Sequence, residues 1–105
     1  MKKITFNIRT NKGKLEQRQG YAVELPEYPD LKFGCCKERC PINSFSRWRV
    51  TELTSGAIFL SGDWNESRKD CIKRTIDRLH KYGLAECKCR ISNFVNQFAD
   101  SGEAN

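Results

Sequence analysis

The feature of this sequence that most constrains its fold is a change of hydrophobic period near Gly62. Before that point apolar and polar residues alternate, most clearly in residues 3–9. A period of two is typical of a β-strand with one buried face. Beyond Gly62, apolar residues recur every three or four positions, as in residues 72–79, which is the period of an amphipathic helix. The pattern predicts a sheet from the first part of the chain and helices from the second.

Alternation and turn residues divide the first part into about five strands. Short connections favour mostly antiparallel pairing. Residues 37–46 are expected to form a polar loop, and the two prolines within residues 26–29 to end a strand. The expected strands are residues 3–9, 21–25, 31–35, 48–53 and 57–60.

Two helices are expected to follow the sheet. Ser67 and Asp70 have the spacing of a capping box at the start of the first helix, and Gly83 is placed to end it. The second helix is expected to be shorter, with an apolar stripe at Ile91, Phe94, Val95 and Phe98. Strands first and helices last indicate an α+β fold.

The length of 105 residues fits one domain. We expect residues 1–99 to form it and residues 100–105 to be a disordered tail. No apolar run approaches the roughly 20 residues that span a bilayer, and the start lacks the apolar block of a signal peptide. We therefore expect a cytoplasmic protein without a membrane partner, in which cysteines are more often metal ligands or buried thiols than disulfides.

Two pairs of cysteines suggest a metal site. Cys36 and Cys40 flank a short loop, and Cys87 and Cys89 are expected to lie just before the second helix. Four thiolates are a common ligand set for structural zinc, and a helix start favours the thiolate form. We therefore predict one structural zinc that ties the middle of the fold to its end.

Alternatives to this ligand set remain open. Cys35 or His80 could replace one of the four, and Cys71 is expected to pack within the first helix. The spacings are C-x3-C and C-x-C rather than the C-x2-C of zinc ribbons. Several of the cysteines could instead be buried small hydrophobic residues.

The net charge of +6, from 19 basic and 13 acidic residues, favours an acidic partner or nucleic acid. Basic residues are densest on the first helix, and a solvated basic surface is the simpler interpretation. Trp48 alternates with Val50 and is expected in the core, whereas Trp64 is the more exposed aromatic residue. The predicted partner-binding residues are Arg68, Arg74, Arg78 and Lys81.

An enzyme is not expected. No residue pairs the single histidine, His80, with a nucleophile, and the sequence has no glycine-rich phosphate loop. A zinc site made of cysteines alone is typically closed and structural. These features favour a protein that acts by binding.

The run Trp48–Gly56, a returning strand, Gly62 and then a basic helix resemble a pattern in small phage and mobile-element proteins. A short, basic, cysteine-bearing α+β chain is similar to anti-CRISPR proteins, some of which hold a structural zinc. The resemblance covers about residues 21–82. It implies a phage-encoded inhibitor that binds and blocks a host defence nuclease of the CRISPR type. The alternative is a zinc-stabilised nucleic-acid-binding or regulatory module.

Overall fold

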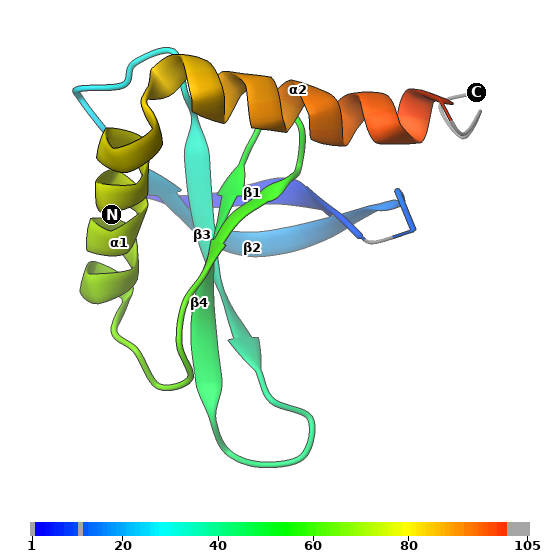
Figure 1. Cartoon of the computed structure of the whole chain (residues 1–105). Coiled ribbons are helices and arrows are strands. Elements are labelled where there is room, and N and C mark those ends of the chain that lie inside the picture. The colour runs from blue at the N-terminus through cyan, green and yellow to red at the C-terminus, as the bar shows by residue number, and fades with distance from the viewer. Residues whose placement is uncertain (1, 11, 101–105) are drawn as a thin grey trace.

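The computed structural model describes residues 2–10 and 12–100, with five strands followed by two helices (Figure 1). The strands are β1 (Lys3–Arg9), β2 (Leu15–Val23), β3 (Phe33–Arg39), β4 (Ser46–Glu52) and β5 (Ile58–Ser61). The helices are α1 (Arg68–Tyr82) and α2 (Leu84–Asp100). The predicted α+β class is confirmed. Asp100 belongs to α2, and the rest of the expected tail, residues 101–105, lies outside the described residues.

The strands form one antiparallel sheet in the order β1-β2-β3-β4-β5. Two hairpins are longer than predicted, because β2 begins at Leu15 and β3 continues to Arg39. The expected loop over residues 37–46 was too long, since residues 37–39 pair with residues 46–48 of β4. Polar side chains are tolerated there because much of that end of the sheet is open to solvent.

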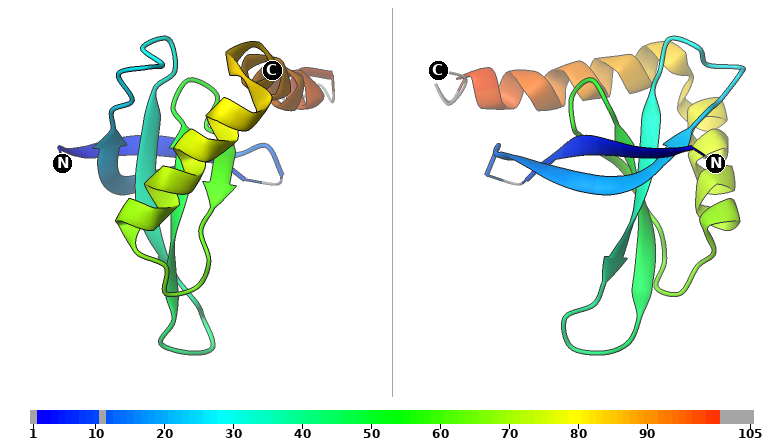
Figure 2. Two further views of the ribbon diagram at one scale, coloured as in Figure 1. Left: turned by 60° about the vertical axis from the view of Figure 1, so that its left-hand side comes forward. Right: turned by 180° about the vertical axis from the view of Figure 1, so that it is seen from behind.

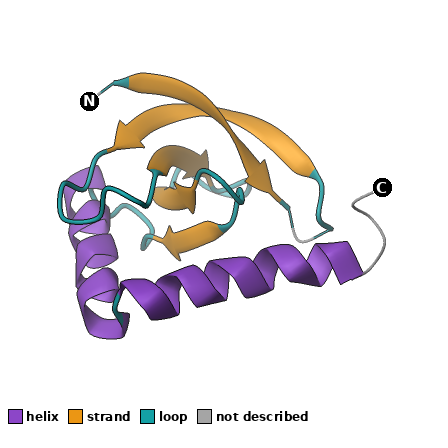
Figure 3. Ribbon diagram, turned by 90° about the horizontal axis from the view of Figure 1, so that it is seen from above, coloured by secondary structure: helices purple, strands orange, loops and turns teal. Residues whose placement is uncertain are grey.

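Strong twist makes the β1–β2 hairpin cross over β3 and β4 (Figures 1 and 3). At the end of β1, the backbone N–H of Arg9 donates to the carbonyl of Gly56 in the β4–β5 turn, at 2.8 Å. Phe6, Ile8 and Cys36 form a small buried cluster from β1 and β3. The sheet thus covers part of one of its own faces, here called the hairpin face.

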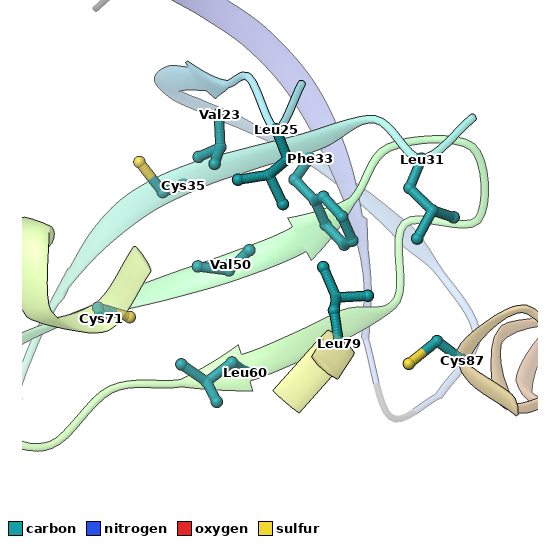
Figure 4. Packing of buried hydrophobic residues seen from close by; sticks show 10 residues of the cluster. All are labelled: Val23, Leu25, Leu31, Phe33, Cys35, Val50, Leu60, Cys71, Leu79 and Cys87. Atoms are coloured by element: carbon teal, nitrogen blue, oxygen red, sulfur yellow. The ribbon is translucent and has the colours of Figure 1, made fainter. Parts of the chain in front are cut away.

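Helix α1 covers the other face, here called the helix face, and packs against β4 and β5 (Figure 2). Leu79 of α1 is fully buried and lies among the side chains of the main cluster, close to Phe33 (Figure 4). Figure 4 shows ten buried residues of this cluster, from β2, β3, β4, β5, both helices and the β2–β3 connection. They are Val23, Leu25, Leu31, Phe33, Cys35, Val50, Leu60, Cys71, Leu79 and Cys87.

Both predicted caps of α1 are present. The Ser67 side chain accepts a hydrogen bond from the backbone N–H of Asp70 at 3.1 Å. Gly83 has φ 79°, and its N–H donates to the Leu79 carbonyl at 2.8 Å. A positive φ is easy only for glycine, so this position ends α1 and turns the chain directly into α2.

The buried stripe of α1 lies one position earlier than the hydrophobic pattern predicts. Cys71, Thr75 and Leu79 are buried, whereas Ile72 and Ile76 are half-buried at the side of the stripe. Thr75 is tolerated in the core because its hydroxyl donates to the Cys71 carbonyl at 3.1 Å. Cys71 packs as the sequence predicts.

Helix α2 has 17 residues and is longer than α1, which has 15, so the expectation of a shorter second helix was wrong. It starts at Leu84, seven positions before Ile91, where the predicted stripe begins. Its C-terminal part extends beyond β3–β5 (Figures 1 and 2). Neither helix, over the residues described, has the length and apolar character needed to cross a membrane.

Strand β2 lies close against the backbone of β3 at Gly20. A Cβ atom at this position would lie 2.0 Å from the Cys35 carbonyl oxygen. We therefore expect Gly20→Ala to lower the free energy of unfolding by about 2 kcal/mol or more, because the strands must separate to admit the methyl group. Urea denaturation measures the change.

Gly83→Ala serves as a comparison that adds backbone strain without a steric clash. No atom lies within 4 Å of a Cβ built there, but φ 79° with ψ 160° is a conformation that only glycine adopts readily, so we expect a cost of about 1 to 3 kcal/mol. An unchanged free energy of unfolding in Gly20→Ala would contradict the close approach at Gly20.

Candidate binding interface

The first pair of predicted zinc ligands lies along an extended strand. Cys36 is inside β3, where it packs with Phe6 and Ile8 on the hairpin face, and Cys40 follows the end of the strand. Four residues of strand span about 13 Å, which is too far for two thiolates to share one ion. The loop that the zinc hypothesis places between these cysteines is mostly strand.

The second pair lies inside α2, not before it as the sequence interpretation placed it. Successive residues of an α-helix are about 100° apart, so Cys87 and Cys89 point in nearly opposite directions. Cys87 is 2% exposed in the main cluster, whereas Cys89 is exposed to solvent. A C-x-C pair chelates an ion from a loop but not from a regular helix.

The structure therefore does not bring the four predicted ligands together. Cys36 and Cys87 belong to separate buried clusters. The possible substitutes lie elsewhere, because Cys35 is in the main cluster and His80 Nε2 lies 3.1 Å from Glu27 Oε2 at the surface. Across residues 2–10 and 12–100, no group of three or more His, Cys, Asp or Glu side chains is placed to hold a metal ion. Zinc remains a prediction from the sequence.

Two of the predicted partner-binding arginines make contacts within the chain. Arg74 Nη1 lies 2.9 Å from Glu66 Oε1 and 3.6 Å from Asp63 Oδ2. Arg78 Nη1 donates to the Phe59 carbonyl of β5 at 2.7 Å. These contacts fasten α1 to the segment before it and to the edge of the sheet.

The other two predicted residues lie at opposite ends of α1. Lys81 Nζ is 5.4 Å from the centre of the Tyr82 ring, near the C-terminus of α1. The Arg68 guanidinium, at the N-terminus of α1, lies 4.7 Å from the Tyr21 ring centre and 5.5 Å from that of Trp48. Arg68 thus joins the start of the helix to aromatic rings of β2 and β4.

Arg68 is the centre of a surface that we call the aromatic–basic face, formed by Tyr21, Lys37, Trp48, Arg68 and Lys69. Lys37 lies opposite Trp48 in the β3–β4 register, and its Nζ is 5.9 Å from the Trp48 ring centre. Lys69 lines a shallow groove together with Trp48 and Arg68. Aromatic residues of β2 and β4 thus meet one cation from β3 and two cations from α1.

The electrostatics of this face differ from those of the Arg74 side of α1. Lys37 and Lys69 are exposed, and neither forms an ion pair with a described residue. The Tyr21 and Trp48 rings are half-buried and tilted at 52° to each other, with centres 6.2 Å apart. Their contact with Arg68 holds its guanidinium in place, since cation–π attraction restricts the side chain. The face presents fixed positive charge beside aromatic carbon.

The sequence interpretation assigned Trp48 to the core and Arg68 to a row of basic residues on the first helix. It therefore did not predict the contact between these two side chains. The alternation signal was correct, because Trp48 does share the helix face with Val50 and packs against the main cluster. It is half-buried rather than buried because α1 leaves it partly uncovered. Trp64 is 41% exposed, as predicted, and carries the Arg47 guanidinium 4.4 Å from its ring centre.

The burial of the thiols gives a test that bears on the zinc prediction. Burial raises the pKa of Cys71 to about 11 and raises the pKa values of Cys35, Cys36 and Cys87 above their ordinary range. A protonated, buried thiol reacts slowly. In the native protein at pH 8 we expect a thiol reagent to modify Cys89 and Cys40 quickly and the remaining four only on unfolding.

Mass spectrometry after partial labelling identifies the modified residues, and elemental analysis of the same sample measures metal. About one zinc per chain, with Cys40 and Cys89 protected, would confirm the zinc prediction and contradict the cysteine positions described here. Rapid labelling of all six thiols would contradict the burial of the two clusters.

Comparisons with known proteins find no family model, no curated protein and no solved structure that matches this chain. The similarity to anti-CRISPR proteins therefore stays a prediction from the sequence.

Proposed function

We propose that this chain is a nucleic-acid-binding protein that uses the aromatic–basic face as its contact surface. The observation that carries the proposal is the position of Arg68, held over Tyr21 and Trp48, on a face that also carries the exposed lysines Lys37 and Lys69. A cation already fixed in place loses little side-chain entropy when it contacts a phosphate.

The composition of the face favours nucleic acid over other acidic ligands. Lysine and arginine contact backbone phosphates, while aromatic rings can stack on bases, and single-stranded nucleic-acid sites combine both. Because phosphate contacts carry no sequence information, the proposed binding tolerates many sequences. The proposed activity is binding alone, without catalysis.

Charge reversal tests the proposal directly. We expect Lys37→Glu combined with Lys69→Glu to weaken binding of a single-stranded oligonucleotide about 100-fold or more at low salt. The magnitude of the slope of log affinity against log salt should fall by about 1.4, since each contact with a single-stranded phosphate contributes about 0.7. Fluorescence anisotropy across a salt series measures both quantities.

The double reversal Lys12→Glu and Lys14→Glu is the matched control. It changes the net charge equally, but at the β1–β2 turn, which lies on the other side of the molecule from α1 (Figure 1). If both double variants bind equally weakly, net charge rather than the aromatic–basic face determines binding, and the proposal fails.

A second candidate function is the one that the resemblance implies, inhibition of a CRISPR nuclease by direct contact with the protein. The tip of the β3–β4 hairpin favours it. Ile42 is 88% exposed and Phe45 is 46% exposed at an extremity of the molecule (Figure 1). The tip is held in shape by hydrogen bonds from Cys40 N–H to the Phe45 carbonyl and from Phe45 N–H to Asn43 Oδ1, each 2.8 Å long. A preorganised apolar tip suits insertion into an apolar pocket of a partner.

The inhibitor function predicts a different result from nucleic-acid binding. We expect the wild-type chain to slow target-DNA cleavage by at least one of a panel of purified CRISPR effector nucleases. Ile42→Ser combined with Phe45→Ser should raise the inhibitory concentration about tenfold or more, because the truncation removes a central apolar anchor. Leu15→Ser, which removes another exposed apolar side chain, is the control. If no effector is inhibited, this second function is wrong while nucleic-acid binding still stands.

A further inference from the structure

A small cavity opens on the hairpin face of the sheet, opposite the aromatic–basic face. Its volume is about 160 Å³, and residues of all five strands line it. Ile8, Cys36 and Thr51 are buried, whereas Arg18 and Ile58 are exposed and leave the cavity open to solvent. The lining residues are Ile8, Arg18, Cys36, Lys37, Glu38, Arg49, Thr51 and Ile58.

Thr51 is the unusual member of this lining. It is 0% exposed, yet its hydroxyl oxygen has no hydrogen-bond partner within the described part of the chain. A buried hydroxyl without a partner is costly, and most such groups in proteins are paired. The register between β4 and β5 shifts at Val50/Thr51, and irregularities of this kind often re-aim a side chain beside a functional site.

The charges around the cavity are mainly positive. Arg49 Nε lies 2.5 Å and Arg47 Nε 3.7 Å from the same Glu38 oxygen, so one carboxylate faces two guanidiniums. Arg18 pairs with Glu16 at 2.7 Å on the exposed side of the hairpin. Arg18 Nη1 also donates to the Gln17 carbonyl at 3.0 Å. Three of the four charged lining residues are nevertheless basic, and Glu38 is already engaged by two arginines.

Cys36 is the lining residue whose side chain lies near both guanidiniums. Both Arg18 and Arg49 pull the pKa of the Cys36 thiol downward, but burial dominates and raises it. The side chain therefore remains a neutral thiol at pH 7 and adds no negative charge. A thiol is at most a weak hydrogen-bond donor.

From this arrangement we propose that the cavity binds a tetrahedral oxyanion of the phosphate type. The guanidiniums of Arg18 and Arg49 are the accessible donors, and Arg49 keeps its contact with Glu38. The Thr51 hydroxyl, which solvent does not reach in this structure, is the third donor once the side chain turns toward the bound ligand. The volume exceeds that of several water molecules, which leaves room for one phosphate group and solvent. The phosphate could be a free ion or the terminal phosphate of a nucleic acid. The site opens on the opposite face of the sheet from the proposed nucleic-acid interface. Lys37 belongs to that interface and also lines the cavity, so the test of the cavity leaves Lys37 unchanged.

Titration of the intact protein with inorganic phosphate, followed by amide chemical shifts in NMR spectra, tests this site. We expect saturable shifts around residues 36 and 51 in the wild type. Thr51→Val should weaken binding about tenfold, because it removes a donor to a charged ligand while preserving side-chain shape. Arg18→Gln should weaken phosphate binding to a similar extent. Because Arg18 is exposed, this substitution should leave the fold intact. Lys32→Gln, a remote exposed cation, should bind like the wild type.

Thermal unfolding without phosphate provides a second readout. Replacing an unpaired buried hydroxyl by a methyl group should leave the unfolding temperature of Thr51→Val unchanged or higher. A marked fall would show that the hydroxyl has an internal partner, and the proposal would be wrong.

A second titration uses a short oligonucleotide with or without a 5′-phosphate, at a salt concentration that suppresses binding to the aromatic–basic face. Binding that requires both the 5′-phosphate and Thr51 identifies a nucleic-acid end as the source of the oxyanion, and binding of inorganic phosphate identifies the free ion. If neither probe shows saturable, Thr51-dependent binding, the cavity holds water only and the proposal is overturned. Equal responses of all variants, Lys32→Gln included, would also overturn it, because they would indicate general screening of surface charge.

Discussion

A single sheet has two faces to cover, and of the two helices in the described part of the chain only α1 lies flat against it. The 15 residues of α1 span about 22 Å, enough to cover the part of the helix face around Leu79 but not the far ends of β3 and β4. On the hairpin face, twist brings β1 across β3, so that Phe6 and Ile8 bury Cys36. The aromatic–basic face and the cavity on the hairpin face both lie where this coverage stops.

Incomplete coverage on the helix face explains why aromatic and basic residues meet there. Trp48 lies on the same face of β4 as Val50, two residues nearer the end of the strand that α1 does not cover. Water would reach the Trp48 ring if no other side chain lay over it. The stem and guanidinium of Arg68 cover it instead, since an arginine can screen apolar surface while it remains solvated. The same contact protects the core and fixes a positive charge at the surface.

Local features of this fold could be predicted from the sequence, whereas features that depend on pairing could not. Ser67 and Gly83 act on their own backbone neighbours, so the ends of α1 were predictable. The positions of the cysteines depend on where elements begin. If cysteine is counted as a small apolar residue, a helical stripe is visible at Leu84, Cys87 and Ile91. The sequence interpretation treated Cys87 as a metal ligand and therefore did not recognise the early start of α2. In the same way, the partner of Arg78 is a carbonyl at the sheet edge, which no residue pattern reveals.

Glu52 and Thr51 are adjacent buried polar residues that differ in whether their side chains are already hydrogen-bonded within the described residues. Glu52 is 2% exposed, but its carboxylate accepts from the Thr54 N–H and hydroxyl and from the Ser55 N–H, and so it holds the β4–β5 turn. Thr51, one residue earlier and on the other face of β4, has no such partner within the described residues. Burial alone therefore does not mark a functional residue in this fold. A buried polar atom that remains unsatisfied, beside a cavity with excess positive charge, is what distinguishes Thr51 from Glu52.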